Sequence, residues 1–207
     1  MLIPFQNITS QYGTPNGIIH IGAHAMEERQ DYFNKGVRNV IWIEANPALS
    51  KQNKQNISHT EKVFEFAASD TDGEVYDFNL TNNGQSSSIL ELGLHKHHHP
   101  HVHVTETIKV TSKRIDTLLA EESIDINGYN FVNLDIQGAE LLALKGFGDL
   151  LKDVKYIYTE VNTNYVYKNC CLIQELDDYL SLFGFNRVAT VMTHAEWGDA
   201  LYINKNN

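Results

Sequence analysis

The chain has 207 residues, 42% of them hydrophobic, which suffices for one substantial core and is short for two full domains. No apolar run approaches the roughly 18 residues that a membrane-spanning helix needs, and the start lacks the basic region and long apolar core of a secretory signal. The formal net charge is −10 and Lys and Arg are scattered singly. This argues against a nucleic-acid substrate, because phosphate binding requires basic clusters.

The two cysteines, Cys170 and Cys171, are adjacent and cannot form an ordinary structural disulfide. A reducing, cytoplasmic setting is the simplest interpretation. We expect one domain over residues 1–207, with no membrane partner. The oligomeric state has no signal in the sequence.

The first half of the chain alternates apolar runs with polar, helix-like segments. Short runs rich in Ile and Val predict buried strands at 17–22, 40–44 and 63–68. Helices are predicted between them, at 27–34 before Gly36 and from Pro47 to about Asn56. The turn at 70–73 (DTDG) then predicts a hairpin strand at 74–80.

An irregular insert at about 81–106 interrupts the alternation, which resumes after it. Further strands are predicted at 107–110, at 131–135 and at 154–161, with helices at 115–122 and 172–183. The end predicts two strands, at 186–192 and 200–203, joined by a turn around Gly198. Strand–helix alternation indicates parallel βαβ units. We therefore expect an α/β fold with a mostly parallel seven-stranded sheet and an antiparallel C-terminal strand.

Three carboxylates stand at the ends of predicted strands. They are Glu44, Asp135 and Glu160. Ligands of open α/β sheets bind at the carboxyl ends of strands, so these side chains are candidates for one site. Each also has a plainer interpretation, as a solvated strand-end acid, a helix cap or the partner of a lysine.

The turn after the first strand, Gly22-Ala23-His24-Ala25-Met26, is rich in small residues, which let a backbone approach a ligand. A dinucleotide dehydrogenase would have G-x-G-x-x-G here. This chain has His24 and Glu27 at the second and third glycine positions, which argues against an oxidoreductase.

The stretch FVNLDIQGAE (131–140), followed by Leu144-Lys145-Gly146, resembles the FkbM family of methyltransferases, whose segment reads hydrophobic-D-hydrophobic-E-G-A-E and then L-K-G. The segment WIEANP (42–47) resembles the family's second motif, and the resemblance covers roughly residues 17–161. The chain departs from the family pattern at His20, His24, Met26, Asn133 and Gln137.

The resemblance implies a single-domain class I methyltransferase (Rossmann-like) fold, S-adenosylmethionine as the cofactor, and O-methyl transfer, often to sugar or natural-product hydroxyls. Glu44 would accept hydrogen bonds from the ribose hydroxyls, and Ala68 and Ser69 would border the adenine. The cofactor-binding residues that it implies are Gly22, Ala23, His24, Glu44, Ala45, Asn46, Ala68, Ser69 and Asp135.

Methyl transfer to an alcohol needs a base or a divalent metal near the acceptor oxygen. Asp135 and Glu160 are expected to act as base and orienting partner, or as oxygen ligands for Mg²⁺ or Mn²⁺. His194, in the terminal turn, is a third catalytic candidate, and an exposed turn histidine is its alternative. Tyr165, Tyr167 and Trp197 are candidates for stacking on a sugar.

The histidine-rich stretch at 95–103 (HKHHHPHVH) has two interpretations. Alternating histidines of an extended chain share one face, where a transition metal could bind. Because no other ligand type accompanies them, we favour a solvated insert that covers the acceptor cleft.

We expect an O-methyltransferase that acts on a hydroxyl of a sugar or glycan. The alternatives are a small-molecule acceptor, a degenerate methyltransferase fold that serves as a binding module, and a metal-storage protein built around the histidines.

Overall fold

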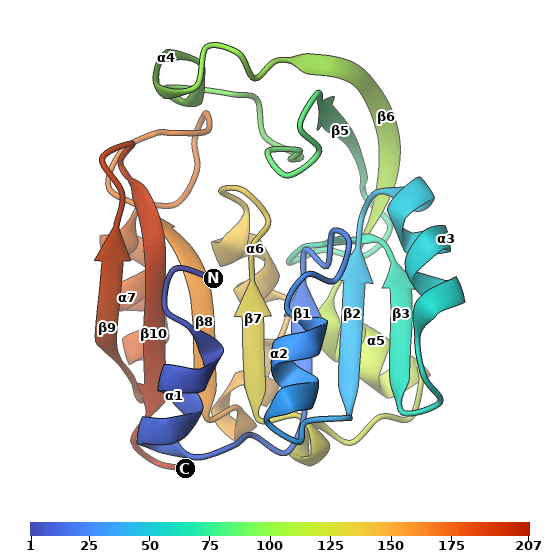
Figure 1. Cartoon of the computed structure of the whole chain (residues 1–207), viewed down its shortest axis with the longest axis vertical. Coiled ribbons are helices and arrows are strands. Elements are labelled where there is room, and N and C mark those ends of the chain that lie inside the picture. Colours follow the sequence, from blue (N-terminus) through green and yellow to red (C-terminus); the bar gives the residue numbers. More distant parts are fainter.

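The computed structural model describes all 207 residues and centres on a seven-stranded sheet, in the order β3-β2-β1-β7-β8-β10-β9 (Figure 1). Neighbouring strands from β3 to β8 are parallel, and β10 is antiparallel to both β8 and β9. The expected α/β fold is confirmed. The strands are β1 (Ile18–Ile21), β2 (Val40–Glu44), β3 (Glu61–Glu65), β7 (Phe131–Leu134), β8 (Tyr156–Asn162), β9 (Phe185–Met192) and β10 (Trp197–Asn204).

Helices cover the sheet on both faces, because the central strands are apolar on both sides. Alternate residues of β1 show this: Ile18 packs in one core with α1 (Phe5–Tyr12) and α2 (Arg29–Asn34), whereas Ile19 packs in the other. That second core contains α5 (Ile115–Glu121), α6 (Glu140–Lys145) and α7 (Ile173–Ser181), and α3 (Pro47–Asn56) lies along β2 and β3. Short 3-10 helices span Ile126–Gly128 and Gly148–Asp153.

A second, three-stranded sheet rises beyond the carboxyl ends of the main strands (Figure 1). It consists of β4 (Ala67–Ala68), β6 (Val104–Lys113) and β5 (Val75–Thr81), in that order. The insert between β5 and β6, which carries α4 (His95–His98), folds over the main sheet. We call the second sheet and this insert the arm.

The arm corrects three sequence predictions. The strand at 63–68 divides, because β3 ends at Glu65 and β4 pairs with β6 instead of the main sheet. The predicted strand at 107–110 is longer and begins inside the predicted insert, at Val104. The hairpin strand at 74–80 pairs with this distant β6.

Two differences concern the ends of the chain. The helix α1 has no counterpart among the predicted elements. Gly198 lies inside β10, and the turn between β9 and β10 is at 193–196 instead. No helix in the structure is long and apolar enough to cross a membrane.

Candidate active site

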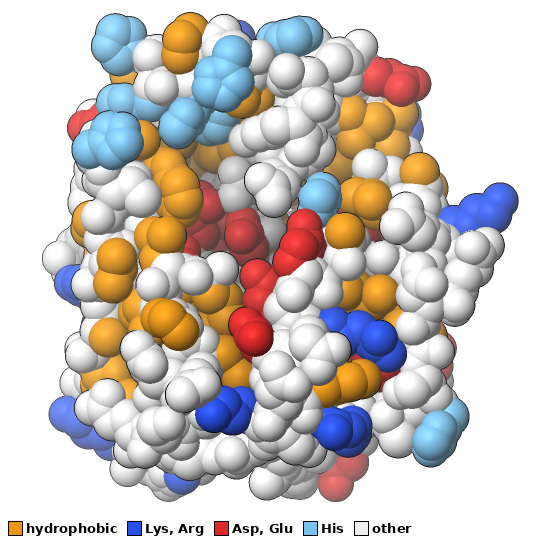
Figure 2. Space-filling model, viewed as in Figure 1, with side chains coloured by type: hydrophobic (Ala, Val, Ile, Leu, Met, Phe, Trp, Pro, Cys, Tyr) orange, Lys and Arg blue, Asp and Glu red, His pale blue; other side chains and the backbone are white.

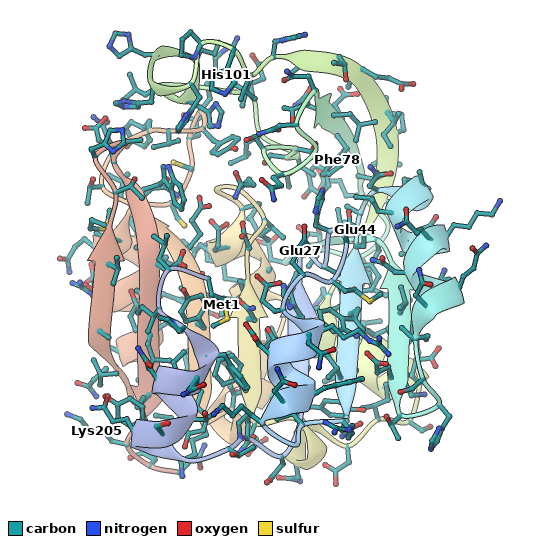
Figure 3. The ribbon with its side chains drawn as sticks, in the orientation of Figure 1. Met1, Glu27, Glu44, Phe78, His101 and Lys205 are labelled. Atoms are coloured by element: carbon teal, nitrogen blue, oxygen red, sulfur yellow. The ribbon has the colours of Figure 1, made fainter.

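Two adjoining cavities lie at the carboxyl ends of the parallel strands, beneath the arm. The first, which we call the apolar cavity, has a volume of about 610 Å³, part of it open to solvent. The main sheet and the arm both line it, with Glu44 at the end of β2 and Phe78 of β5 above (Figure 3). Its apolar side chains include Ile43, Leu49, Phe66, Phe78, Ile89 and Ile136.

The second cavity, which we call the acidic cavity, has a volume of about 1280 Å³ including open solvent. Figure 2 shows its carboxylates in a central hollow, with histidines gathered above them. No Lys or Arg lines it. Its carboxyl side chains are Glu27, Glu28, Asp135, Glu160 and Asp199, and its histidines are His20, His24, His95, His99 and His101.

The two cavities share a short stretch of wall, which we call the junction. It consists of Gly22, His24, Gln85, Asp135 and Gln137. A ligand that occupies one cavity can therefore present a reactive atom to a ligand in the other at these residues.

Glu44 is a buried acceptor at the edge of the apolar cavity, with 6% of its surface exposed. Its Oε2 accepts a hydrogen bond from the backbone N–H of His24 at 2.7 Å, and its Oε1 accepts one from Asn46 at 2.7 Å. Burial raises the pKa of Glu44 above its usual range, although the two backbone bonds oppose that shift. Each oxygen keeps a lone pair for a ligand hydroxyl.

The loop after β1 passes directly against the loop after β7. Gly22 has φ +87°, and a Cβ built on it would lie 1.9 Å from the carbonyl oxygen of Asp135. His24 follows two residues later in the same loop, and its carbonyl oxygen accepts a hydrogen bond from the Asn53 amide at 2.7 Å. The glycine is thus required by packing between two loops of the site.

Asp135 and Glu160 do come together, with Gln137 between them. The Gln137 amide nitrogen donates to Asp135 Oδ1 at 2.6 Å and to Glu160 Oε2 at 2.7 Å. Glu140 stands apart: its Oε1 accepts the backbone N–H of Ile136 at 3.2 Å and of Gly138 at 3.0 Å. Glu140 therefore holds the loop, whereas Asp135 and Glu160 line the acidic cavity.

These acids are harder to ionise than ordinary carboxyls. Asp135 is open to the cavity but lies deep in the fold, and burial raises its pKa to about 6. Burial, followed by repulsion from Asp135 and Glu140, raises the pKa of Glu160 well above its usual range. Two neighbouring acids with separated pKa values can hold one proton and accept another.

Two departures from the family pattern meet beneath the acidic cavity. His20 of β1 and Asn133 of β7 are paired in register. Asn133 Nδ2 donates to the hydroxyl of Tyr32 at 2.7 Å, and that hydroxyl lies 3.1 Å from His20 Nδ1. The hydroxyl proton is thus directed to Nδ1, which leaves the imidazole proton on Nε2, and burial lowers the pKa of His20.

Histidines from the insert form the roof of the acidic cavity (Figures 2 and 3). His95 Nε2 lies 3.1 Å from Ser86 Oγ, and burial lowers the pKa of His95 to about 4. His98 Nε2 lies 3.1 Å from Glu196 Oε2, in the turn before β10. The insert is therefore tied to the turn between β9 and β10. No group of three or more His, Cys, Asp or Glu side chains is arranged to hold a metal ion.

Several predicted residues lie away from both cavities. Ala23 packs in the core beside Phe5 of α1, and its backbone N–H donates to Ile43 at 3.0 Å. Ser69 is buried, with its hydroxyl 3.1 Å from that of Tyr76. His194 is exposed in its turn. The residues that do line a cavity are Gly22, His24, Glu44, Ala45, Asn46, Ala68, Asp135 and Glu160.

Other lining residues have no clear signal in the sequence. Gln85 reaches the junction from the irregular insert, and Phe78 reaches the apolar cavity because β5 pairs with β6. Tyr167 and Trp197 line the acidic cavity, as the stacking proposal requires, but Tyr165 does not. The only sequence signal for Phe78 is the alternation of apolar and polar residues along β5, which places Phe78 on the apolar face of that strand.

The chain is 27% identical over 153 residues to 2-O-methyltransferase NoeI of Sinorhizobium fredii, a match that covers 68% of this chain and 60% of that protein. The chain thus spans less than two thirds of this relative.

Among solved structures, Sp1610 of Streptococcus pneumoniae, assigned as a tRNA (m1A22) methyltransferase, has a TM-score of 0.55 at 9% identity, covering 99% of this chain and 70% of that chain. TrmK of M. capricolum, in complex with S-adenosylhomocysteine, has a TM-score of 0.50 at 9% identity, covering 100% and 70%. These likenesses confirm the class I methyltransferase fold. The family described as "Methyltransferase FkbM domain" matches residues 20–187, and the chain belongs to this family of methyltransferases.

Proposed function

We propose that this protein is an S-adenosylmethionine-dependent O-methyltransferase whose acceptor is a hydroxyl of a sugar or glycan. The observation that carries the proposal is the junction, where an apolar cavity with a buried carboxylate meets an acidic cavity. The first has the chemistry for an adenosine, and the second has the chemistry for a polyhydroxyl acceptor and a base.

The apolar cavity fits the nucleoside part of the cofactor. Its apolar walls suit an adenine ring, and Glu44 offers both carboxylate oxygens to ribose hydroxyls. Ala45, Asn46 and Ala68 complete that wall. When bound, S-adenosylmethionine would supply a methyl group on a positively charged sulfur. Asp135, at the junction, is the one carboxyl side chain that lines both cavities.

Asp135 and Glu160 fit the proton chemistry of an alcohol acceptor. Transfer forms a C–O bond, breaks the C–S bond with its electron pair left on sulfur, and releases the hydroxyl proton. Asp135 Oδ2 accepts no hydrogen bond from the protein, so it is available for that proton.

The lining of the acidic cavity supports a neutral acceptor. It offers carboxylates, amides, hydroxyls and the rings of Tyr167 and Trp197, and no Lys or Arg that could bind a phosphate or carboxylate. The similarity to a 2-O-methyltransferase is consistent with a hydroxyl acceptor.

The test has two steps. Calorimetric titration of S-adenosylhomocysteine into ligand-free protein should give micromolar binding, and isotope-labelled methyl transfer should then be measured to a panel of neutral sugars and glycans. Product mapping should place the methyl group on oxygen. Absence of binding to folded protein would reject the cofactor, and transfer to nitrogen or carbon alone would reject O-methylation.

A further inference from the structure

Gln137 has all of its side-chain hydrogen-bonding groups directed into the acidic site. Its two amide protons are donated to Asp135 Oδ1 (2.6 Å) and Glu160 Oε2 (2.7 Å), and its Oε1 accepts from the hydroxyl of Tyr167 at 2.5 Å. The opposite amide orientation would place Oε1 against two carboxyl groups. The donors therefore face the acids.

The backbone of Gln137 is held in a conformation that side chains rarely adopt. Its φ is +58°, in the left-handed region that favours glycine. Its carbonyl oxygen accepts a hydrogen bond from Ser88 Oγ of the insert at 2.9 Å. Strain of this kind is typical of functional sites, where the surroundings impose it.

Two neighbouring carboxyl groups repel each other when both are ionised, so the ionised pair is stabilised by a hydrogen-bond donor or a cation between them. No Lys or Arg lines the acidic cavity, and Gln137 occupies the position between the two acids. With glutamate at position 137, three carboxylates would converge, an oxygen-rich set of the kind that binds Mg²⁺ or Mn²⁺.

We propose that Gln137 is a positioning residue that takes the place of a cation between Asp135 and Glu160. Its amide fixes the separation of the two acids, stabilises their ionised forms, and leaves Asp135 Oδ2 free to take the acceptor's hydroxyl proton. The proton leaves oxygen as the C–O bond forms and is then held by the Asp135 carboxyl group. This role rests on the proposed function for the identity of the proton donor.

Two substitutions test the proposal. Gln137→Leu removes the amide, so the lower pH midpoint of kcat should rise by about one unit, because a carboxylate that loses a hydrogen-bond donor is protonated more readily. Gln137→Glu should bind Mn²⁺ at least about tenfold more tightly than the wild type, since it adds a third carboxylate.

The matched control is Gln174→Glu. Gln174 Nε2 also donates to a carboxylate, Asp178 Oδ1 at 2.9 Å, but on the exposed surface of α7. The control should leave both the pH midpoint and the Mn²⁺ affinity unchanged.

Unchanged Mn²⁺ affinity in folded Gln137→Glu protein would overturn the proposal, as would an unshifted pH midpoint in Gln137→Leu. Should Gln137→Glu not fold, the midpoint of Gln137→Leu decides. The Mn²⁺ titration needs no methyl transfer, so a gain in affinity without any wild-type transfer supports the geometry and counts against the proposed function alone.

Discussion

The backbone of Asp135 packs directly against Gly22, although the two residues belong to different loops. A Cβ on Gly22 would lie 1.9 Å from the Asp135 carbonyl oxygen, so no side chain fits there. This contact joins the loop after β1 to the loop after β7. It thereby fixes the position of the Asp135 carboxylate relative to His24, the next junction residue contributed by the first loop.

The Gly22–Asp135 contact predicts a large effect of Gly22→Ala on stability. Gly36→Ala is the matched control, because Gly36 has φ +85° but open space around it. The control isolates the backbone cost of about 1 kcal/mol, and Gly22→Ala should lower the free energy of unfolding by at least about 2 kcal/mol more, since a backbone must move. Urea unfolding measures both, and equal losses would contradict the packing role of Gly22.

Glu44→Gln should weaken the binding of S-adenosylhomocysteine by at least about tenfold. Glutamine has only one side-chain oxygen, which can accept from the backbone N–H of either His24 or Asn46. Its NH₂ group then faces the other N–H, so one charge-assisted hydrogen bond is lost. Glu65→Gln is the control, since Glu65 also ends a strand but is exposed and outside the cavity. Calorimetry is the measurement. Equal affinities in the two variants would remove Glu44 from the cofactor site.

Most of the site residues that could be predicted from the sequence lie at the carboxyl ends of strands. Glu44, Asp135 and Glu160 lie within two residues of the ends of buried strands. Because strand burial is a local property of the sequence, all three were expected near one edge of the sheet. Their distances were not predictable, because they depend on Gln137, whose side chain turns back from a left-handed residue.

Differences from the expected placement arise where a residue's environment depends on distant parts of the chain. Ala23 faces the core because α1, which has no counterpart among the predicted elements, packs against it. Ser69 turns away because the chain leaves the main sheet after β3 and pairs with β6, more than thirty residues later. His20 and Asn133, which differ from the family pattern, are compensated by Tyr32. Long-range pairing of this kind has no local signal.

Asp135→Asn should remove catalysis and, at high pH, stabilise the fold. The folded-state pKa of Asp135 is about 6, against an ordinary value of 3.8, so the folded protein binds this proton more tightly than the unfolded chain. Wild-type stability therefore falls as pH rises from about 4 to about 6, and the asparagine variant lacks that decline.

The measurement is thermal unfolding at pH 4 and pH 8. The melting temperature of the variant, relative to that of the wild type, should be higher at pH 8 than at pH 4. Each kcal/mol of unfolding free energy corresponds to a shift of about 2–4 °C in melting temperature. Asp153→Asn, at an exposed position, should show no such difference between the two pH values. If the variant instead loses stability relative to the wild type between pH 4 and pH 8, the fold stabilises the ionised form of Asp135, and the prediction is wrong.

The acidic cavity should discriminate against anionic acceptors. A methyl hexoside and the matching hexuronate present the same ring, but the uronate adds a carboxylate near Asp135 and Glu160 with no Lys or Arg to offset it. The α-ammonium group of Met1 also lines the cavity, but it lies 3.5 Å from the carboxylate of Glu28, which offsets its charge. Burial lowers the pKa of His95 to about 4 and also lowers that of His99, so these two roof histidines carry no positive charge at neutral pH. A charge pair at about 4 Å and intermediate dielectric is worth several kcal/mol.

We therefore expect kcat/KM for the neutral sugar to exceed that for the uronate by at least about tenfold at pH 7.5 and low salt, and the ratio to shrink as salt screens the repulsion. Initial rates of labelled methyl transfer at two salt concentrations measure both effects. A ratio near one that is insensitive to salt would mean that the acceptor carboxylate lies outside the acidic cavity, and a preference for the uronate would mean that the cavity carries a positive charge which its side chains do not provide.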